Sequence, residues 1–105
     1  MSFQPKLVRD KIPEIIQKNG TLCEFATMNQ AEYRRRLCDK MREEVDEFSS
    51  EPSLEEVADV YEVFLAVLEE WGYPWPDVIR EAAWKRRERG GFSEKILLKT
   101  IGEKV

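Results

Sequence analysis

The chain has 105 residues and a formal net charge of −4, with 36% of its residues charged. This length predicts one domain over residues 1–105, and the mild net charge argues against a general binder of polymeric nucleic acid. No apolar stretch approaches the ~18 residues of a membrane span, and two cysteines without histidine exclude a zinc site. Free cysteines without a secretion signal predict a cytoplasmic location.

The sequence predicts an all-α fold of four to five helices. The expected helices cover residues 10–18, 29–48, 53–71 and 76–89. Asn29 and Ser53 precede the second and third helices, and each is followed three positions later by a glutamate, as in a capping box. Residues 21–28 favour extended chain or a short strand, and the tail 92–105 stays open between strand, short helix and loose arm.

Acidic residues dominate the middle of the chain. Residues 43–70 contain eleven carboxylates and no Lys or Arg. Because successive residues of a helix are turned by about 100°, Glu44 falls on the apolar stripe of the second helix. Glu47 lies at the edge of that stripe, Asp46 on the opposite side, and Glu43 faces more outward. We therefore expect Glu44 to point inward and Asp46 to be solvated.

The third helix repeats this arrangement. Glu56 shares a line with the apolar positions 60, 63 and 67, and Asp59 lies about 60° away, at the boundary of the apolar face. Helices joined by a short turn pack antiparallel, so the inward carboxylates of the two helices can face each other. The sequence alone leaves an alternative in which Glu56 is only a capping residue and Glu44 is partly exposed.

Converging carboxylates repel one another and need a cation or raised pKa values. Oxygen ligands with room for water and phosphate favour Mg²⁺, with Mn²⁺ as an alternative. A basic stretch suits a phosphorylated ligand, since residues 80–99 hold seven basic and three acidic side chains. The plainer alternative is that the acidic and basic helix faces pair with each other.

Three motifs follow one another along the chain: the opening KLVRDKIPEII of residues 6–16, then EExxE at 43–47 with ExxD at 56–59, and last KRRERGGF at 85–92. In this order they resemble the motifs of the MazG-like nucleoside triphosphate pyrophosphohydrolases. This all-α superfamily includes dimeric dUTPases and phosphoribosyl-ATP pyrophosphohydrolases. The resemblance implies a MazG-like helical bundle and Mg²⁺-dependent cleavage between the α- and β-phosphates of a nucleotide, giving a nucleoside monophosphate and pyrophosphate.

The resemblance also implies residue roles. The implied metal ligands are Glu44, Glu47, Glu56 and Asp59. The implied catalytic carboxylates are Glu43, Glu44 and Glu47, with Glu43 as an outer-shell or water-orienting group. The implied substrate-binding residues are Arg9, Lys11, Lys85 and Arg89.

One departure bears on the substrate. Only eight residues separate Glu47 from Glu56, fewer than is common between these motifs, which leaves the base and sugar open. The resemblance implies a homodimer or homotetramer with sites built from helices of two subunits. Two alternatives stay open: a phosphoribosyl-ATP-type pyrophosphohydrolase, and a non-catalytic helical module that binds a nucleotide or a partner.

Overall fold

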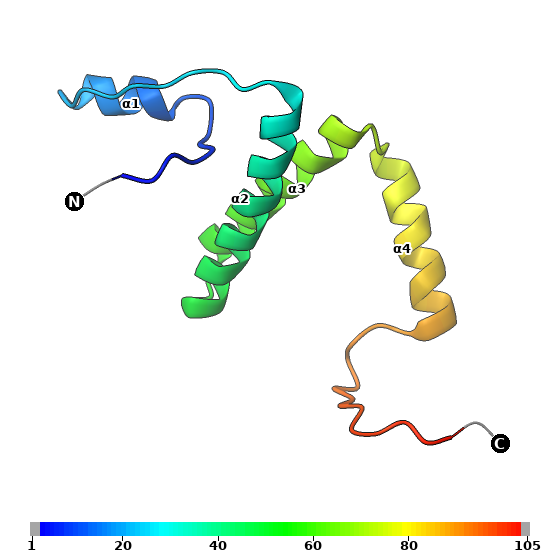
Figure 1. Ribbon diagram of the computed structural model, residues 1–105. Helices are drawn as coiled ribbons and strands as arrows, with labels where there is room; N and C mark the ends of the chain where they lie inside the picture. The colour runs from blue at the N-terminus through cyan, green and yellow to red at the C-terminus, as the bar shows by residue number, and fades with distance from the viewer. Residues whose placement is uncertain (1–2, 104–105) are drawn as a thin grey trace. The chain divides into compact units, whose positions relative to one another are not determined.

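The computed structural model describes residues 3–103, which form four α-helices and no strand (Figure 1). The helices are α1 (Ile12–Lys18), α2 (Gln30–Ser50), α3 (Leu54–Trp71) and α4 (Trp75–Arg89). The predicted all-α class is therefore confirmed. Within residues 3–103, neither the strand considered for 21–28 nor a fifth helix in the tail is formed, and positions 104 and 105 lie outside the described residues.

Both predicted N-caps are present. The Asn29 side chain accepts a hydrogen bond from the backbone N–H of Glu32 at 2.9 Å, and Ser53 Oγ accepts one from the N–H of Glu56 at 3.1 Å. These bonds satisfy amide donors that the first turn of a helix leaves open. Gly72 ends α3 with a left-handed φ of 71°, which glycine adopts without steric cost.

The chain divides into two compact units, one ending at Gly72 and one beginning at Tyr73. The single domain over residues 1–105 stays a prediction. None of the described helices combines the length and the apolar character that crossing a membrane requires.

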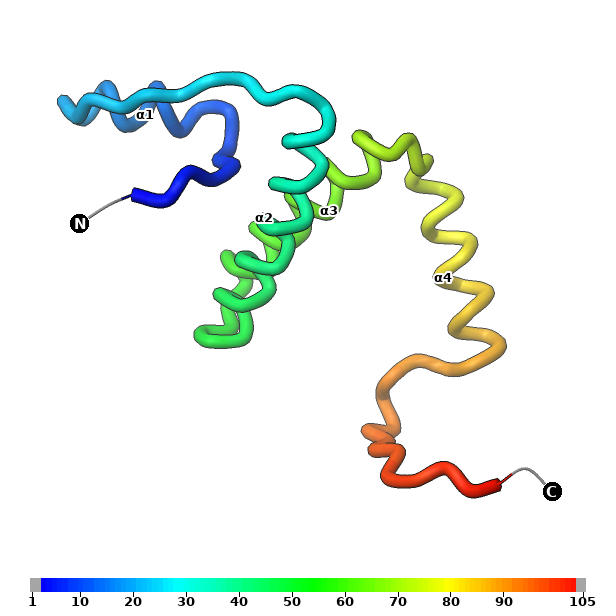
Figure 2. The backbone as a smooth tube through the Cα atoms, viewed as in Figure 1, coloured from blue at the N-terminus to red at the C-terminus, as the bar shows by residue number. Residues whose placement is uncertain are grey.

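In the first unit, α2 and α3 pack side by side as a hairpin with a short turn (Figures 1 and 2). Its buried apolar side chains are Leu37 from α2 and Val63 and Leu68 from α3. Glu44 is buried in the same hairpin, with 6% of its surface exposed. The core of this unit therefore contains a carboxylate among few apolar side chains, and burial of such a group needs compensation.

An arginine ties the start of α2 to the end of α3. Arg34 Nε donates to Glu70 Oε2 at 2.7 Å, and its guanidinium lies 5.1 Å from the centroid of the Trp71 ring. A cation over an aromatic face adds to the ion pair. This contact fixes the register of the hairpin, and with it the level at which the carboxylates of the two helices meet.

Candidate metal centre

Three carboxylates from the two helices of the hairpin converge. Glu44 of α2 and Glu56 and Asp59 of α3 each offer an oxygen, and these oxygens all lie within 4.8 Å of one another. The spacing of three residues places Glu56 and Asp59 on one face of α3, and the antiparallel hairpin brings that face to Glu44. The structure thus brings together three of the four predicted metal ligands, named here the acidic cluster.

Two oxygens of the acidic cluster lack a partner. Glu44 Oε2 and Glu56 Oε2 are both buried without a hydrogen bond. Leaving a buried charged acceptor unsatisfied is costly. A hard divalent cation is bound by carboxylate oxygens of this kind, so the residues present fit Mg²⁺.

Glu47, the fourth predicted ligand, lies exposed and outside this three-residue group. Glu47 is nevertheless affected by the acidic cluster. The negative charge of Glu44 and, to a lesser degree, partial loss of hydration raise the Glu47 pKa. Burial first, and then the charges of Asp59 and Glu44, raise the pKa of Glu56 as well. The charges of the neighbouring carboxylates therefore disfavour ionisation of Glu56 and of Glu47 at the exposed edge of the cluster.

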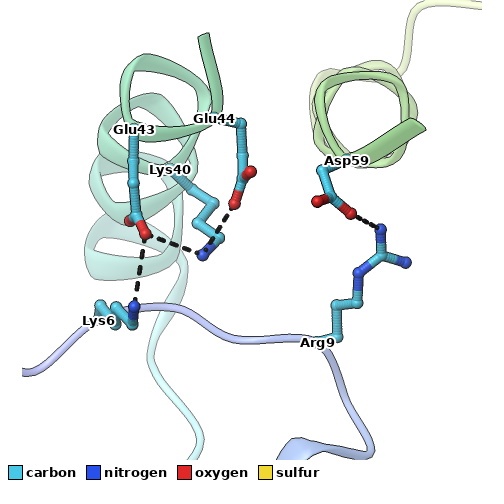
Figure 3. A network of polar contacts seen from close by, with 6 residues as sticks. All are labelled: Lys6, Arg9, Lys40, Glu43, Glu44 and Asp59. Atoms are coloured by element: carbon cyan, nitrogen blue, oxygen red, sulfur yellow. Dashed lines mark hydrogen bonds and ion pairs between the residues drawn. The ribbon is translucent and has the colours of Figure 1, made fainter. Parts of the chain in front are cut away.

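Cations lie beside two residues of the acidic cluster, Glu44 and Asp59 (Figure 3). Lys40 Nζ lies 3.2 Å from Glu44 Oε1 and 3.4 Å from Glu43 Oε1, and Lys6 Nζ lies 3.4 Å from the same Glu43 oxygen. Glu43 is therefore held beside the cluster by two lysines. Neither lysine was predicted from the sequence as part of the site. The i,i+3 and i,i+4 spacing to Glu43 and Glu44 could have revealed Lys40, whereas Lys6 lies 37 residues from Glu43 and left no local signal.

Arg9, predicted to bind substrate, contacts a predicted metal ligand. Arg9 Nη2 donates to Asp59 Oδ1 at 2.8 Å. Figure 3 shows Lys6 and Arg9 on one stretch of chain, with Lys6 reaching Glu43 on α2 and Arg9 reaching Asp59 on α3. The N-terminal segment thus bridges the two helices that carry the carboxylates.

The other predicted phosphate-binding residues lie away from these contacts or in the other unit. Lys11 is exposed at the N-cap of α1. Lys85 and Arg89 are exposed on α4, in the unit that begins at Tyr73. Their contact with phosphate stays a prediction.

Comparison with known proteins gave no match: no family model, no curated protein and no solved structure corresponds to this chain. The resemblance to MazG-like enzymes therefore rests on the three sequence motifs, and membership of that family stays a prediction.

Proposed function

We propose that this protein is a Mg²⁺-dependent nucleotide pyrophosphohydrolase that converts a (d)NTP or a related nucleotide into a nucleoside monophosphate and pyrophosphate. The observation that carries the proposal is the acidic cluster, with buried Glu44 and Glu56 oxygens that have no hydrogen-bond partner. Charge neutralisation and an oriented water are the main requirements of phosphoryl hydrolysis. This reaction does not require a histidine, which the chain lacks. Because its cysteines are free, we propose that the protein works in the cytoplasm.

The chain's own residues would divide the work as follows. Glu44, Glu56 and Asp59 would hold Mg²⁺ or Mn²⁺, with Glu47 joining from the exposed rim. When bound, the ion would neutralise phosphate charge and lower the pKa of the attacking water. The set proposed to bind substrate phosphates is Arg9, Lys11, Lys85 and Arg89.

In the reaction, the water oxygen forms a bond to the α-phosphorus. The bond from that phosphorus to the bridging oxygen breaks, and its electron pair leaves with pyrophosphate. Glu43 would orient the water, and a carboxylate of the cluster, such as Glu47, would accept its proton.

A panel of (d)NTPs, together with phosphoribosyl-ATP, tests this proposal by measuring pyrophosphate release with Mg²⁺. We expect at least one substrate to be hydrolysed, and Glu44→Gln and Asp59→Asn to lower turnover by about 100-fold or more, since even indirect ligand supports are worth 10–100-fold. The control is Asp46→Asn, an exposed carboxylate on α2. Absence of any pyrophosphate-releasing substrate, or full turnover in both variants, would contradict the proposal.

A second candidate is a non-catalytic helical module that binds a nucleotide. It is favoured by the Arg9–Asp59 and Lys40–Glu44 ion pairs, which already neutralise part of the cluster. Isothermal titration that detects nucleotide binding without turnover on the same panel would support this candidate.

We further propose that the protein works as a homodimer or homotetramer. Within the first unit, α3 packs along α2, yet Leu54 and Val57 of α3 remain exposed. These two residues lie three positions apart on one face of the helix, and exposed apolar patches of this kind mark interaction surfaces. A second copy offers the same surface, so two hairpins could bury it together as a four-helix arrangement.

Light scattering coupled to size exclusion measures this assembly. We expect a dimer or tetramer for the wild type and a monomer for Val57→Glu, because a charge in an apolar interface is costly. The control is Leu22→Glu, since Leu22 is 97% exposed and lies outside the helices. A monomeric wild type would contradict the proposed assembly.

A further inference from the structure

We propose that Lys6 and Lys40 form a binding site for the terminal phosphates of the nucleotide, and hence for pyrophosphate, directly beside the acidic cluster. This inference rests on the proposed function and deepens it, since neither lysine was assigned a role by the sequence motifs. The ligand chemistry is that of a phosphate oxyanion.

The two lysines converge although their charges repel. They come from different segments, 34 residues apart in sequence, and both ammonium groups lie 3.4 Å from the same oxygen, Glu43 Oε1. An anion placed between two ammonium groups offsets their mutual repulsion. Glu43 currently supplies that anion, and its carboxylate shows where a phosphate oxygen would be stabilised.

These contacts are loose enough to exchange. Strong charge-assisted N–H···O bonds measure about 2.7–2.9 Å. The Arg9–Asp59 bond, at 2.8 Å, falls in this range, whereas the lysine contacts to Glu43 do not. An ammonium group has three donors, so each lysine can turn to a phosphate without moving its stem far. Lys40 is also well placed to act in a desolvated setting, because 15% of its side chain is exposed.

A cavity of about 170 Å³ opens beside the two lysines. Residues 5–7 line it on one side, and Arg36, Asp39, Lys40 and Glu43 of α2 line it on the other. A water molecule takes about 30 Å³, so the cavity has room for a phosphate group but lies below the ~300 Å³ of a small-ligand pocket. By size, it therefore admits a phosphate group and leaves the base and sugar outside.

The wall of this cavity is anchored. Arg36 Nη1 donates to the carbonyl oxygen of Pro5 at 3.1 Å, which holds the N-terminal segment against α2. Arg36 Nη2 also lies 3.5 Å from Glu32 Oε1, so both terminal nitrogens of this guanidinium are engaged and its role here is to hold the segment. Lys6 and Lys40 are the cations proposed to turn toward a ligand.

Lys40 should disfavour binding of the divalent cation and favour binding of the phosphate. Its ammonium lies 3.2 Å from Glu44 Oε1, where it competes with a divalent cation for that carboxylate. Removing the charge of Lys40 should therefore tighten metal binding and weaken phosphate binding. A merely structural lysine would affect both in the same direction.

The test is isothermal titration of inorganic pyrophosphate in the presence of Mg²⁺, with Mn²⁺ affinity measured separately by electron paramagnetic resonance. We expect Lys40→Met to weaken pyrophosphate binding by roughly tenfold or more, as loss of a charged hydrogen bond implies, while Mn²⁺ binds at least as tightly as to wild type. Lys6→Met should weaken pyrophosphate binding less, and Lys40→Arg should restore it to within a few-fold of wild type.

The matched control is Lys18→Met. Lys18 forms an i,i+4 ion pair with Glu14 at 3.3 Å, as Lys40 does with Glu44, but it lies on α1 outside the cavity. We expect wild-type pyrophosphate affinity for this variant. Wild-type affinity in Lys40→Met, a parallel loss of both ligands, or no pyrophosphate binding by the wild type would each overturn the inference.

The inference and the proposed function fail separately. Normal nucleotide turnover in Lys40→Met, with unchanged pyrophosphate affinity, would reject the lysine site but keep the proposed hydrolase activity. Pyrophosphate binding with the expected pattern among the variants, but no hydrolysis of any nucleotide, would reject the hydrolase activity and keep the lysine site for phosphate.

Discussion

Replacing Glu56 with Gln is expected to raise the melting temperature of the metal-free protein, abolish its stabilisation by Mg²⁺ and lower turnover by about 100-fold or more. The metal-free gain arises because Glu56 Oε2 is buried without a hydrogen-bond partner, and because burial first, and then the charges of Asp59 and Glu44, raise the Glu56 pKa. A neutral amide removes this repulsion and can donate a hydrogen bond to Glu44 or Asp59.

Thermal unfolding in EDTA and in Mg²⁺ measures both effects. For the wild type, Mg²⁺ at about 100 times its Kd should stabilise the fold by about 2.7 kcal/mol. The control variant is Glu62→Gln, an exposed carboxylate on α3, for which we expect the wild-type response to Mg²⁺. A Glu56→Gln protein that keeps the full Mg²⁺-induced shift would rule out Glu56 as a ligand.

Truncation of Leu37 to Ala is expected to have the largest effect on stability. Leu37 is 1% exposed, and within residues 3–103 it is the one large side chain that is fully buried. Leu→Ala changes at such sites cost about 2–5 kcal/mol, which lowers the melting temperature of a domain this size by about 8 °C or more. With so few buried apolar side chains, little remains to compensate for this loss.

Urea denaturation monitored by circular dichroism measures this effect. Leu22→Ala is the matched control, because Leu22 is 97% exposed and substitutions at such sites change stability by about 0.5 kcal/mol or less. Equal midpoints for the two variants would show that Leu37 does not anchor the hairpin in solution.

Local signals in the sequence predicted the helices well. The caps at Asn29 and Ser53 depend on residues three positions apart, so they could be read directly from the chain. The sequence predicts that α2 ends at Phe48, but the helix ends at Ser50, because Ser49 Oγ donates to the carbonyl oxygen of Val45 and is satisfied within the helix. The two serines at positions 49 and 50 therefore do not end the helix, contrary to the prediction.

The inward and outward carboxylates were also predictable, since they follow from the angular period of a helix. Glu44 is buried and Asp46 is exposed, as expected. The ion pairs of Lys6 and Arg9 were not predictable, because they join segments 37 and 50 residues apart and leave no periodic signal. Such contacts depend on how the N-terminal segment crosses the hairpin.

The short turn between α2 and α3 has a consequence for how the protein folds. Glu44 and Glu56 are twelve positions apart in the sequence, so bringing them together closes a small loop at little entropic cost. Contacts that are local in sequence form early and quickly. A divalent cation that bridges the two glutamates would therefore act on the nascent hairpin, and refolding should be faster with Mg²⁺ than without it.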